Sequence, residues 1–466
     1  MIVPMDLGLP TICFDPDLIA HYDVPGPRYT SYPPASHFRA DFDQTTIRAE
    51  IERSQAAARP LSLYVHVPFC ATVCLYCACT KIVTRNRDAA TKYLEHLDRE
   101  FALYGPLFHG RIVTQIHWGG GTPTFLSVAE MDWLMALTRR HFELLDRGHG
   151  EYSIEIDPRT VDADTVWALS GMGFNRMSLG VQDFDPRVQK AVHRIQSEER
   201  TRTVVETARQ AGFRSINVDL IYGLPYQSKR TFKDTLDKVI ELMPDRLSVF
   251  NYAHLPRLFK MQRLIDPSTL PDPQEKLQIL GLTIERLTHA GYEYIGMDHF
   301  ARADDELTLA QRKQQLWRNF QGYSTRGGSD LVGLGMSAIS QIGSCYAQNE
   351  KSLPEYYARL EAGRLPTARG IQLSDDDLLR RDVIMSLICH MRIDFCDIER
   401  RYGIRFAHYF TSEIRTLGRM VNEGLVKIGN TGIVITDLGR MLIRNICMVF
   451  DRYQQAGAPA RGSRTI

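Results

Sequence analysis

The sequence lacks the features that mark membrane, secreted and nucleic-acid-binding proteins. Its 466 residues contain no apolar run of about 18 residues or more, so we expect no membrane span. Residues 1–17 hold no basic region followed by an apolar stretch, so we predict no secretory signal and expect a cytoplasmic location. The formal net charge of only +1 gives no reason to expect nucleic acid as a partner.

Cysteine is scarce and unevenly distributed. Only nine of the 466 residues are cysteines, and four of them, Cys70, Cys74, Cys77 and Cys79, fall within ten residues. A disulfide framework would spread its cysteines more evenly through a much smaller secreted chain. The pattern therefore indicates metal binding in a reducing compartment.

The chain does contain a regular alternation of two patterns between residues 60 and 255. Short β-rich runs alternate with amphipathic segments, such as 89–104 and 128–145, in which apolar residues recur every three or four positions. Strands that alternate with crossover helices predict a parallel sheet, either a partial barrel or an open doubly wound sheet. The predicted strands are 62–67, 113–118, 152–157, 176–181, 216–221 and 247–252.

The ends of these strands carry unusual residues. Active sites of parallel α/β folds lie at the carboxyl ends of the strands, so we expect these residues to share one face. In strand order they are PFCATVCLYC, GGGTPT, Glu155 with Asp157, VQD, YGLP and NYAHLP.

The chain is long enough for an α/β barrel with an appended unit. We predict an N-terminal arm over 1–60, packed on the barrel, a catalytic domain over 61–370, and a mainly helical domain over 371–466. In the last part, GLVKIGNTGIVITDLGR predicts two short strands joined by Gly-Asn, as in a winged-helix wing. DNA binding is one interpretation, but a cap over the barrel mouth is favoured because no basic recognition helix accompanies the wing.

Cys70, Cys74 and Cys77 form a Cx3CxxC triplet directly after the first predicted strand. Three thiolates on one short loop suit zinc or an iron–sulfur cluster. Zinc would need a fourth ligand, for which Cys79 or His66 is within sequence reach, whereas a cluster with three protein ligands keeps one iron open. The glycine-rich segment after the second strand favours the cluster.

The triplet, with Tyr76 before its third cysteine, resembles the radical S-adenosylmethionine superfamily. The resemblance implies a partial (β/α)6 barrel and a [4Fe–4S] cluster on Cys70, Cys74 and Cys77, whose free iron chelates S-adenosylmethionine. One electron from the cluster would break the cofactor's C–S bond and give a 5′-deoxyadenosyl radical, while the protein binds and orients the cofactor. Cys79 must then stay off the cluster.

Over nearly its whole length the chain resembles the oxygen-independent coproporphyrinogen III oxidase family. This implies decarboxylation of two propionates of coproporphyrinogen III to vinyl groups, giving protoporphyrinogen IX for haem synthesis, with an unidentified reduced electron donor; we expect a monomer. Ala78 departs from the family's glycine, and His193 stands before Arg194 where a polar residue is more frequent. The shared segments include PGPRYTSYP, YVHVPFC, HWGGGTPT, SIEIDPR, LGVQDF, VDLIYGLP, RLSVFNYAHLP, IGMDHFA, RNFQGYS and IRNICM.

Two strand ends are candidates for the cofactor site on their own chemistry. Glycines at 119–121 let a ligand approach the backbone and its N–H groups, although a tight turn before a helix cap at Thr122 would look similar. Glu155, in an apolar run, is costly to bury unpaired, so it is expected to accept hydrogen bonds from a ligand or to form a structural salt bridge. The resemblance places the methionyl end of S-adenosylmethionine at Gly120, Gly121 and Thr122.

Further cofactor residues come from the resemblance alone. It assigns Gln182, Arg194, Asp219 and Ala253 to a second S-adenosylmethionine, which these residues by themselves do not indicate. The other residues that it places against the cofactors are Tyr64, Tyr76 and Ile339, the last on the adenine.

A substrate with four carboxylates should be met by arginines, which bind carboxylates in a bidentate manner. The candidates are Arg28, Arg302 and Arg318. His299 is either a proton donor or a packed core histidine, and we assign no catalytic residue.

Two other classes of function remain. A haem-binding chaperone of the same superfamily would carry a porphyrin without transforming it, but Cys79, the PRYTSYP arm and the IRNICM end favour the enzyme. A DNA-binding regulator with structural zinc rests on the wing alone.

Overall fold

The computed structural model describes residues 12–42 and 44–455. The contacts of the chain gather in two compact units, each drawn from separate stretches of sequence. The three consecutive parts expected from the sequence stay a prediction, and the N-terminal residues on which the absence of a secretory signal was argued lie partly outside the described residues. The sheet unit is Ser36–Lys276 with Arg326–Ser374, and the terminal unit is Met1–Ala35, Leu277–Thr325 and Asp375–Ile466.

The centre of the sheet unit is a parallel sheet built from the six predicted strands, in the order β9-β8-β7-β6-β4-β1. A seventh strand, β14 (Asp330–Leu334), lies parallel to β1 on its other side. Each neighbouring pair of the six is parallel, so the predicted α/β architecture is confirmed. The strands are β1 (Leu61–Val67), β4 (Ile112–Gly120), β6 (Glu151–Ile156), β7 (Arg176–Gln182), β8 (Ser215–Tyr222) and β9 (Arg246–Asn251).

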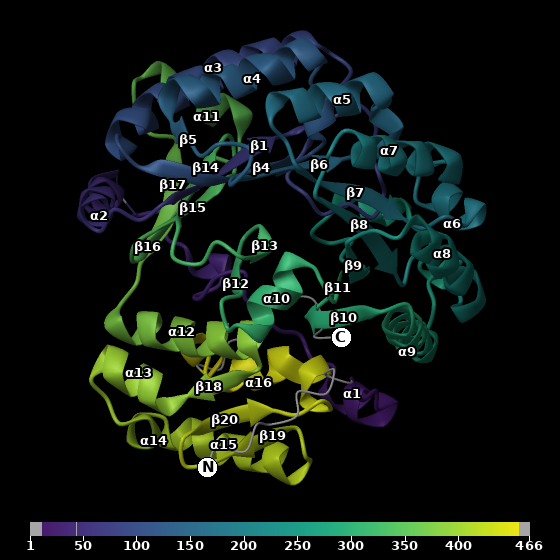
Figure 1. The fold of residues 1–466 in the computed structure, drawn as a ribbon, viewed down its shortest axis with the longest axis vertical. Helices are drawn as coiled ribbons and strands as arrows, with labels where there is room; N and C mark the ends of the chain where they lie inside the picture. The colour runs from purple at the N-terminus through teal and green to yellow at the C-terminus, as the bar shows by residue number, and fades with distance from the viewer. Residues whose placement is uncertain (1–11, 43, 456–466) are drawn as a thin grey trace. The chain divides into compact units, whose positions relative to one another are not determined.

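The crossover helices of the sheet unit lie along one side of the strands, which is the arrangement of a partial barrel and not of a doubly wound sheet (Figure 1). The helices are α3 (Asp88–Tyr104), α4 (Val128–His141), α5 (Ala163–Met172), α7 (Glu198–Gln210) and α8 (Lys229–Leu242). Side-chain caps fix the starts of three of them: Ser127 of α4 and Ser228 of α8 form capping boxes, and Asp162 before α5 accepts from the Thr165 amide.

One predicted helix, 128–145, is too long. Helix α4 ends at His141, and β5 (Glu143–Leu144) then pairs parallel with the start of β4. The apolar pattern runs on through this segment, but the pairing of Leu144 with Val113 takes it into the sheet, so tertiary contacts override the helical period.

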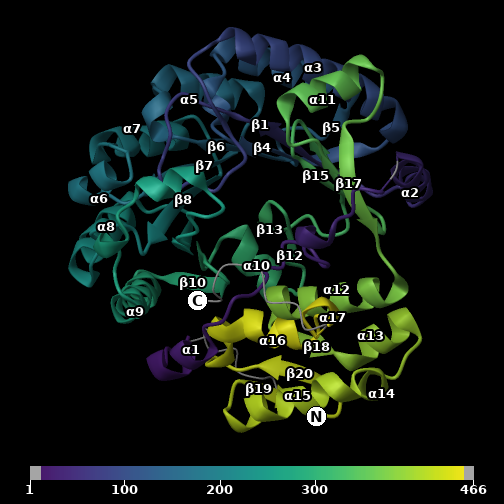
Figure 2. The same cartoon turned by 180° about the vertical axis from the view of Figure 1, so that it is seen from behind.

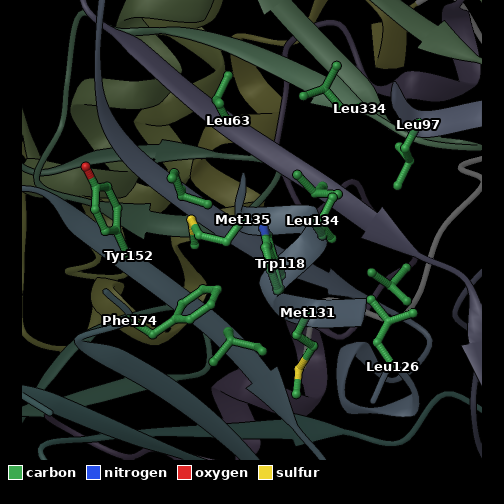
Figure 3. Packing of buried hydrophobic residues seen from close by; sticks show 14 of the residues in the cluster. Leu63, Leu97, Trp118, Leu126, Met131, Leu134, Met135, Tyr152, Phe174 and Leu334 are labelled. Carbon is green, nitrogen blue, oxygen red and sulfur yellow. The ribbon is translucent and has the colours of Figure 1, made fainter. Parts of the chain in front are cut away.

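Alternate residues of the strands point into the core between sheet and helices. Leu63 of β1, Trp118 of β4 and Phe174 before β7 are fully buried there, and the Trp118 and Phe174 rings meet edge to face with centroids 4.7 Å apart (Figure 3). Because strand side chains alternate between faces, the residues between them must lie on the opposite face of the sheet. That face carries the site described below.

Three antiparallel strands extend the sheet beyond β14, and these were not predicted. They are preceded by a loop at Gly335, whose amide donates to Glu100 of α3 at 2.7 Å. Glu100 is fully buried and also accepts from the Asn349 amide and the Tyr356 hydroxyl, which ties α3 to the extension. The three strands are β15 (Ile339–Ile342), β16 (Cys345–Asn349) and β17 (Thr367–Gln372). The helices α2 (Gln44–Ala56) and α11 (Leu353–Glu361) belong to the same edge of the unit, where Figure 2 labels them with β15 and β17.

The terminal unit is mainly helical and contains two short hairpins and a small sheet. The predicted wing is present as β19 (Val426–Ile428) and β20 (Gly432–Ile435), and β18 (Arg392–Asp394) adds a third strand. Every helix in the described part of the chain is too short or too polar to cross a bilayer. The other elements of this unit are α1 (Pro16–Tyr22), α9 (Pro273–His289), β10 (Tyr292–Gly296), β11 (His299–Arg302), α10 (Glu306–Arg312), β12 (Trp317–Asn319), β13 (Gly322–Ser324), α12 (Asp375–His390), α13 (Phe395–Tyr402), α14 (Phe406–Tyr409), α15 (Thr411–Asn422), α16 (Ile443–Val449) and α17 (Arg452–Gln455).

Candidate functional site

Polar side chains line the face of the parallel sheet that the helices leave open. The register places Tyr64 of β1 beside His117 of β4, and His117 beside Ser153 of β6. On the next strands Gly180 of β7 lies beside Asp219 of β8. The sequence expectation that the strand ends share one face is therefore met for these strands.

The cysteine loop leaves the sheet at β2 (Phe69–Cys70) and is closed by β3 (Ile82–Val83), which pairs with β2 in parallel. Its middle is fastened to the segment after α6 (Pro186–Ala191), because the Leu75 amide donates to the Val192 carbonyl at 3.0 Å. The His193 ring bonds the Val73 carbonyl at 2.9 Å. The loop is thus held at both ends and in the middle.

Cationic and hydrogen-bonding groups surround two of the three thiols. Arg194 Nη1 lies 3.4 Å and Arg159 Nη2 3.7 Å from Cys74 Sγ. The hydrogen bond from Cys79, aided by Lys81, lowers the pKa of the Cys77 thiol. Positive neighbours favour the thiolate, which is the form that binds metals.

The remaining thiol is buried. Burial raises the pKa of Cys70, and its sulfur lies 3.4 Å from the Thr122 hydroxyl at the end of the glycine loop. Cys79 is exposed. Arg159 is a member of this site that the sequence did not single out; the only signal was its position in SIEIDPR, two residues after Asp157.

The glycine loop packs directly against the chain that enters the cysteine loop. A Cβ on Gly121 would stand 2.6 Å from the Pro68 carbonyl oxygen, and Gly120, at φ +116°, would strain any other residue. The amides of Gly121 and Thr122 donate to the Val67 and Phe69 carbonyls. The glycines therefore serve close packing of two loops, and the argument from exposed N–H groups does not hold for these amides.

Glu155 has partners inside the protein and is also accessible. Its carboxylate accepts from His117 Nε2 and from the Gly120 amide, each at 3.1 Å, while 43% of the side chain stays exposed. Burial of the group acts to raise its pKa, but these two hydrogen bonds outweigh it and lower the pKa. The expected alternatives are both present, since Glu155 pairs with His117 and keeps surface open for a ligand.

Tyr64 continues this network. Its ring stacks on His117 with centroids 5.8 Å apart, and its hydroxyl lies 3.1 Å from His66 Nδ1. His66 in turn bonds the Thr80 carbonyl on the far arm of the cysteine loop at 3.0 Å. The polar row on the sheet is therefore connected to the cysteine loop through named side chains.

Arg194 is a second link between the sheet and the cysteine loop. It is only 6% exposed, and its guanidinium donates to Asp157 Oδ2 at 3.0 Å, to the Gly180 carbonyl and to the Cys74 sulfur. Its Nε is buried without a partner in the described part of the chain.

Gln182 and Asp219 lie on the neighbouring strands β7 and β8. Gln182 sits at a bulge with φ +70°, and its Oε1 is buried without a partner among the residues described. Asp219 accepts from Ser178 and Asn217, each at 2.8 Å, and burial raises its pKa to about 6. The structure therefore brings Gln182, Arg194 and Asp219 to adjacent strand ends.

The remaining predicted cofactor residues lie in the same unit but show less. The Tyr76 carbonyl accepts from Gln262 at 2.9 Å, and its ring packs on the cluster that includes Tyr252, the neighbour of Ala253. Ile339 begins β15, where its backbone packs against Gly333.

The predicted substrate residues all lie in the terminal unit. Arg28 pairs with Asp298 at 2.6 Å, and Arg302 forms an exposed pair with Asp304. Arg318 is 5% exposed. The His299 ring packs edge-on against Tyr323, with centroids 5.3 Å apart.

Comparison with known families identifies the sheet. The sequence model of the Radical SAM superfamily matches residues 64–239, and that of the HemN C-terminal domain matches residues 373–442. The cofactors of this superfamily are a [4Fe–4S] cluster and S-adenosylmethionine. In the described residues no three Cys, His, Asp or Glu side chains converge tightly enough for a single metal ion. Three thiols on one anchored loop, two of them with cationic neighbours and the third beside the Thr122 hydroxyl, fit a cluster with one thiolate per iron.

The similarity to known proteins covers nearly the whole chain. The chain is 52% identical to oxygen-independent coproporphyrinogen III oxidase of Pseudomonas aeruginosa, over 98% of this chain and 100% of the relative. It is 51% identical to the Escherichia coli protein of the same name, over 96% and 97%. The solved structure of the Escherichia coli coproporphyrinogen III oxidase, HemN, superposes with a TM-score of 0.91 at 50% identity, over 95% of this chain and 100% of that structure. The chain belongs to the oxygen-independent coproporphyrinogen III oxidase family of radical S-adenosylmethionine enzymes.

Proposed function

We propose that this chain converts two propionate side chains of coproporphyrinogen III to vinyl groups without oxygen, giving protoporphyrinogen IX for haem synthesis. The observation that carries the proposal is the 52% identity over 98% of the chain, which includes the C-terminal domain as well as the radical S-adenosylmethionine sheet. Similarity limited to the sheet would indicate the cofactors but would not identify the substrate.

The cofactors supply the radical chemistry. Cys70, Cys74 and Cys77 would hold the cluster, which when bound and reduced would supply the electron for the radical cleavage of S-adenosylmethionine. The residues of this chain hold these groups: Arg159 and Arg194 lie close to Cys74, and Thr122 lies close to Cys70. Cys79, which is exposed, would not bind the cluster, and three protein ligands would leave one iron available to the cofactor.

The first S-adenosylmethionine is proposed at Gly120, Gly121, Thr122 and Glu155. Support comes from the Glu155 carboxylate, which is ionised, fixed by His117 and partly open, so it can accept from the ammonium group of an amino acid. Tyr64, stacked on His117, and Tyr76 would border the cofactors, and Ile339 would meet the adenine.

A second S-adenosylmethionine is proposed at Gln182, Arg194, Asp219 and Ala253. Gln182 Oε1 and Arg194 Nε are buried and have no partner in the described part of the protein, which is costly unless a ligand supplies one. Asp219, with its raised pKa, would exchange a proton near pH 6 unless a cationic ligand holds it ionised.

At the substrate, each turnover removes one hydrogen atom from a propionate β-carbon. The C–CO2 bond then breaks, CO2 leaves, and one electron passes to an acceptor so that the vinyl double bond forms. The sequence of events runs twice per tetrapyrrole. A separate reduced donor, which the chain does not identify, would supply the electron to the cluster, and we propose a cytoplasmic monomer.

The test is anaerobic incubation of the reconstituted protein with coproporphyrinogen III labelled in its propionate carboxyls, S-adenosylmethionine and a reductant. We expect labelled CO2 and products with vinyl groups, and neither from a Cys74→Ser variant. A fully loaded protein that releases no CO2 and instead binds haem stoichiometrically would overturn the proposal in favour of a porphyrin carrier.

A further inference from the structure

Arg318 in β12 of the terminal unit is a buried cation for which the described residues supply no counter-ion. It is 5% exposed, and two of its guanidinium nitrogens, Nε and Nη1, are buried with no hydrogen-bond partner among the described residues. Its guanidinium lies over the Tyr323 ring, 4.8 Å from the centroid, and no carboxylate in residues 12–42 or 44–455 forms an ion pair with it. An unpaired buried charge is costly, so a counter-ion that the described residues do not provide would stabilise Arg318.

Two further arginines are connected to Arg318 through a chain of contacts. Tyr323 faces Arg318 across the β12–β13 hairpin and meets the His299 ring edge-on. Asp298, next to His299, accepts from Arg28 at 2.6 Å. The contact chain thus runs from Arg318 to Arg28 inside one unit.

Arg444 completes the group from the other end of the sequence. It is 5% exposed and donates to the carbonyls of Gly26 and Pro27, directly before Arg28. Burial, and then the charges of Arg28 and Arg318, lower the pKa of Arg444 to about 10, although Asp298 opposes this. Arg444 belongs to the IRNICM segment and was not among the predicted substrate residues.

The same contacts separate the three arginines expected from the sequence. Arg302 pairs with Asp304 at the surface, with 44% of its side chain exposed, so solvent already meets its charge. Arg28 and Arg318 belong to the contact chain with Arg444. We propose that Arg318, with Arg444 and Arg28, forms an anion site that binds a carboxylate of the tetrapyrrole substrate.

The chemistry fits a carboxylate closely. The guanidinium of Arg318 offers two unused buried donors, and a carboxylate accepts two parallel N–H groups from one arginine. Among the described residues Arg318 has no carboxylate partner, so an added anion would lower the electrostatic cost of its burial. The proposal rests on the proposed function, since a tetrapyrrole with propionates is the expected ligand.

The test uses coproporphyrin III, the oxidised form of the substrate, which keeps its carboxylates but does not turn over. Its fluorescence reports equilibrium binding to the complete chain without S-adenosylmethionine or reductant. We expect Arg318→Met to weaken binding tenfold or more, Arg318→Lys to weaken it less, and Arg302→Met, the matched surface control, to leave it unchanged. The tetramethyl ester, which has no charge, should bind the unmodified chain and Arg318→Met equally.

Thermal unfolding separates a ligand site from a structural arginine. Removing an unpaired buried charge should leave the melting temperature of Arg318→Met equal to or above that of the unmodified chain, whereas a structural arginine would lower it. Unchanged porphyrin affinity in Arg318→Met overturns the inference, as does a joint fall in melting temperature and ester binding. If Arg318→Met does not fold, unchanged affinity in Arg318→Lys overturns it.

The outcomes are independent of catalysis. Binding that depends on Arg318 in a protein that releases no CO2 would refute the proposed function and keep the anion site. Release of CO2 by a protein whose porphyrin affinity does not depend on Arg318 would support the proposed function and refute the anion site.

Discussion

Arg194 in the sheet unit and Arg318 in the terminal unit are both more than nine-tenths buried, but their surroundings differ. Arg194 donates to the Asp157 carboxylate, the Gly180 carbonyl and the Cys74 sulfur. Arg318 has the face of Tyr323 and no counter-ion in the described part of the chain. Removing a buried charge that the fold neutralises should destabilise the protein, whereas a buried charge that the fold leaves unpaired costs stability until a counter-ion binds.

The largest effect is expected on the iron content of the protein, and it tests whether Cys74, the sulfur beside Arg194, is a cluster ligand. Replacing Cys74 by Ser should abolish the cluster, because a hydroxyl is a far poorer ligand for iron than a thiolate. Cys79→Ser should keep the cluster, and Cys396→Ser, an exposed cysteine of the terminal unit, is the matched control. Iron and sulfide are counted after anaerobic reconstitution. Equal loss in Cys79→Ser and Cys74→Ser would show that the open iron has been misassigned.

Replacing each of the two buried arginines by methionine tests whether Arg194 stabilises the fold and Arg318 does not. Arg194→Met leaves the buried Asp157 with Arg159 as its remaining partner, so it should lower the free energy of unfolding by about 3 kcal/mol. Arg318→Met should cost nothing or add stability. Urea unfolding of the two variants beside the unmodified chain measures both changes. Equal changes in the free energy of unfolding for the two variants would show that the ion pair of Arg194 does not distinguish it from Arg318.

A charge held for a ligand should show in affinity more than in stability. Glu155→Gln keeps the shape of the side chain but removes the charge, so binding of S-adenosylmethionine should weaken by about 2–3 kcal/mol. Glu143, which is exposed in β5, provides the control variant Glu143→Gln. Equilibrium dialysis with labelled cofactor on the loaded protein gives the affinities. If Glu155→Gln binds S-adenosylmethionine as tightly as the parent does, Glu155 has a structural role and does not bind the cofactor.

Glu100 offers a third case, a buried carboxyl that meets only neutral donors. Burial raises its pKa to about 7, above its value in the unfolded chain. The folded state therefore binds more protons between about pH 4.5 and 7, and the stability due to Glu100 is present at low pH and is lost as pH rises through 7. Relative to Glu100→Gln, the parent should lose about 2 kcal/mol between pH 5 and pH 8. Chemical unfolding across that range measures the change, and Glu95→Gln, on the exposed side of α3, is the control. The raised pKa of Glu100 would be contradicted if the stability difference between the parent and Glu100→Gln did not change with pH, as expected for Glu95→Gln.

Much of the sheet unit was predictable because its signals are local. Each parallel strand is a short β-rich run between amphipathic helices, the three cysteines of the triplet lie on one short loop, and the three glycines are consecutive. The strands β15 to β17 were not predicted because β16 is buried at every position and so shows no alternation, and β17 pairs with β16 across the intervening helix α11. The extent of α4 was wrong because Leu144 is held by a strand 31 residues earlier.

The polar contacts were less predictable than the elements. Nothing in the sequence distinguishes Arg318 from Arg302, because the difference lies in burial and in the absence or presence of a neighbouring carboxylate. Arg444 could not be found at all, since its partners Gly26 and Pro27 lie more than 400 residues away along the chain. The glycine loop was found, but the function of its amides was not, because the carbonyls that accept from them belong to another loop.

The position of Arg194 has a consequence for the reduction potential of the metal centre. Its guanidinium lies 3.4 Å from the Cys74 sulfur and also donates to the Gly180 carbonyl on β7, beside Gln182. A fixed positive charge at this distance stabilises the more negative, reduced form of a cluster and so raises its midpoint potential. For a cluster bound to Cys74, as proposed above, a ligand on β7 that drew the guanidinium away from the sulfur would lower that potential, and the ease of reduction would then depend on the molecule at the neighbouring strand end.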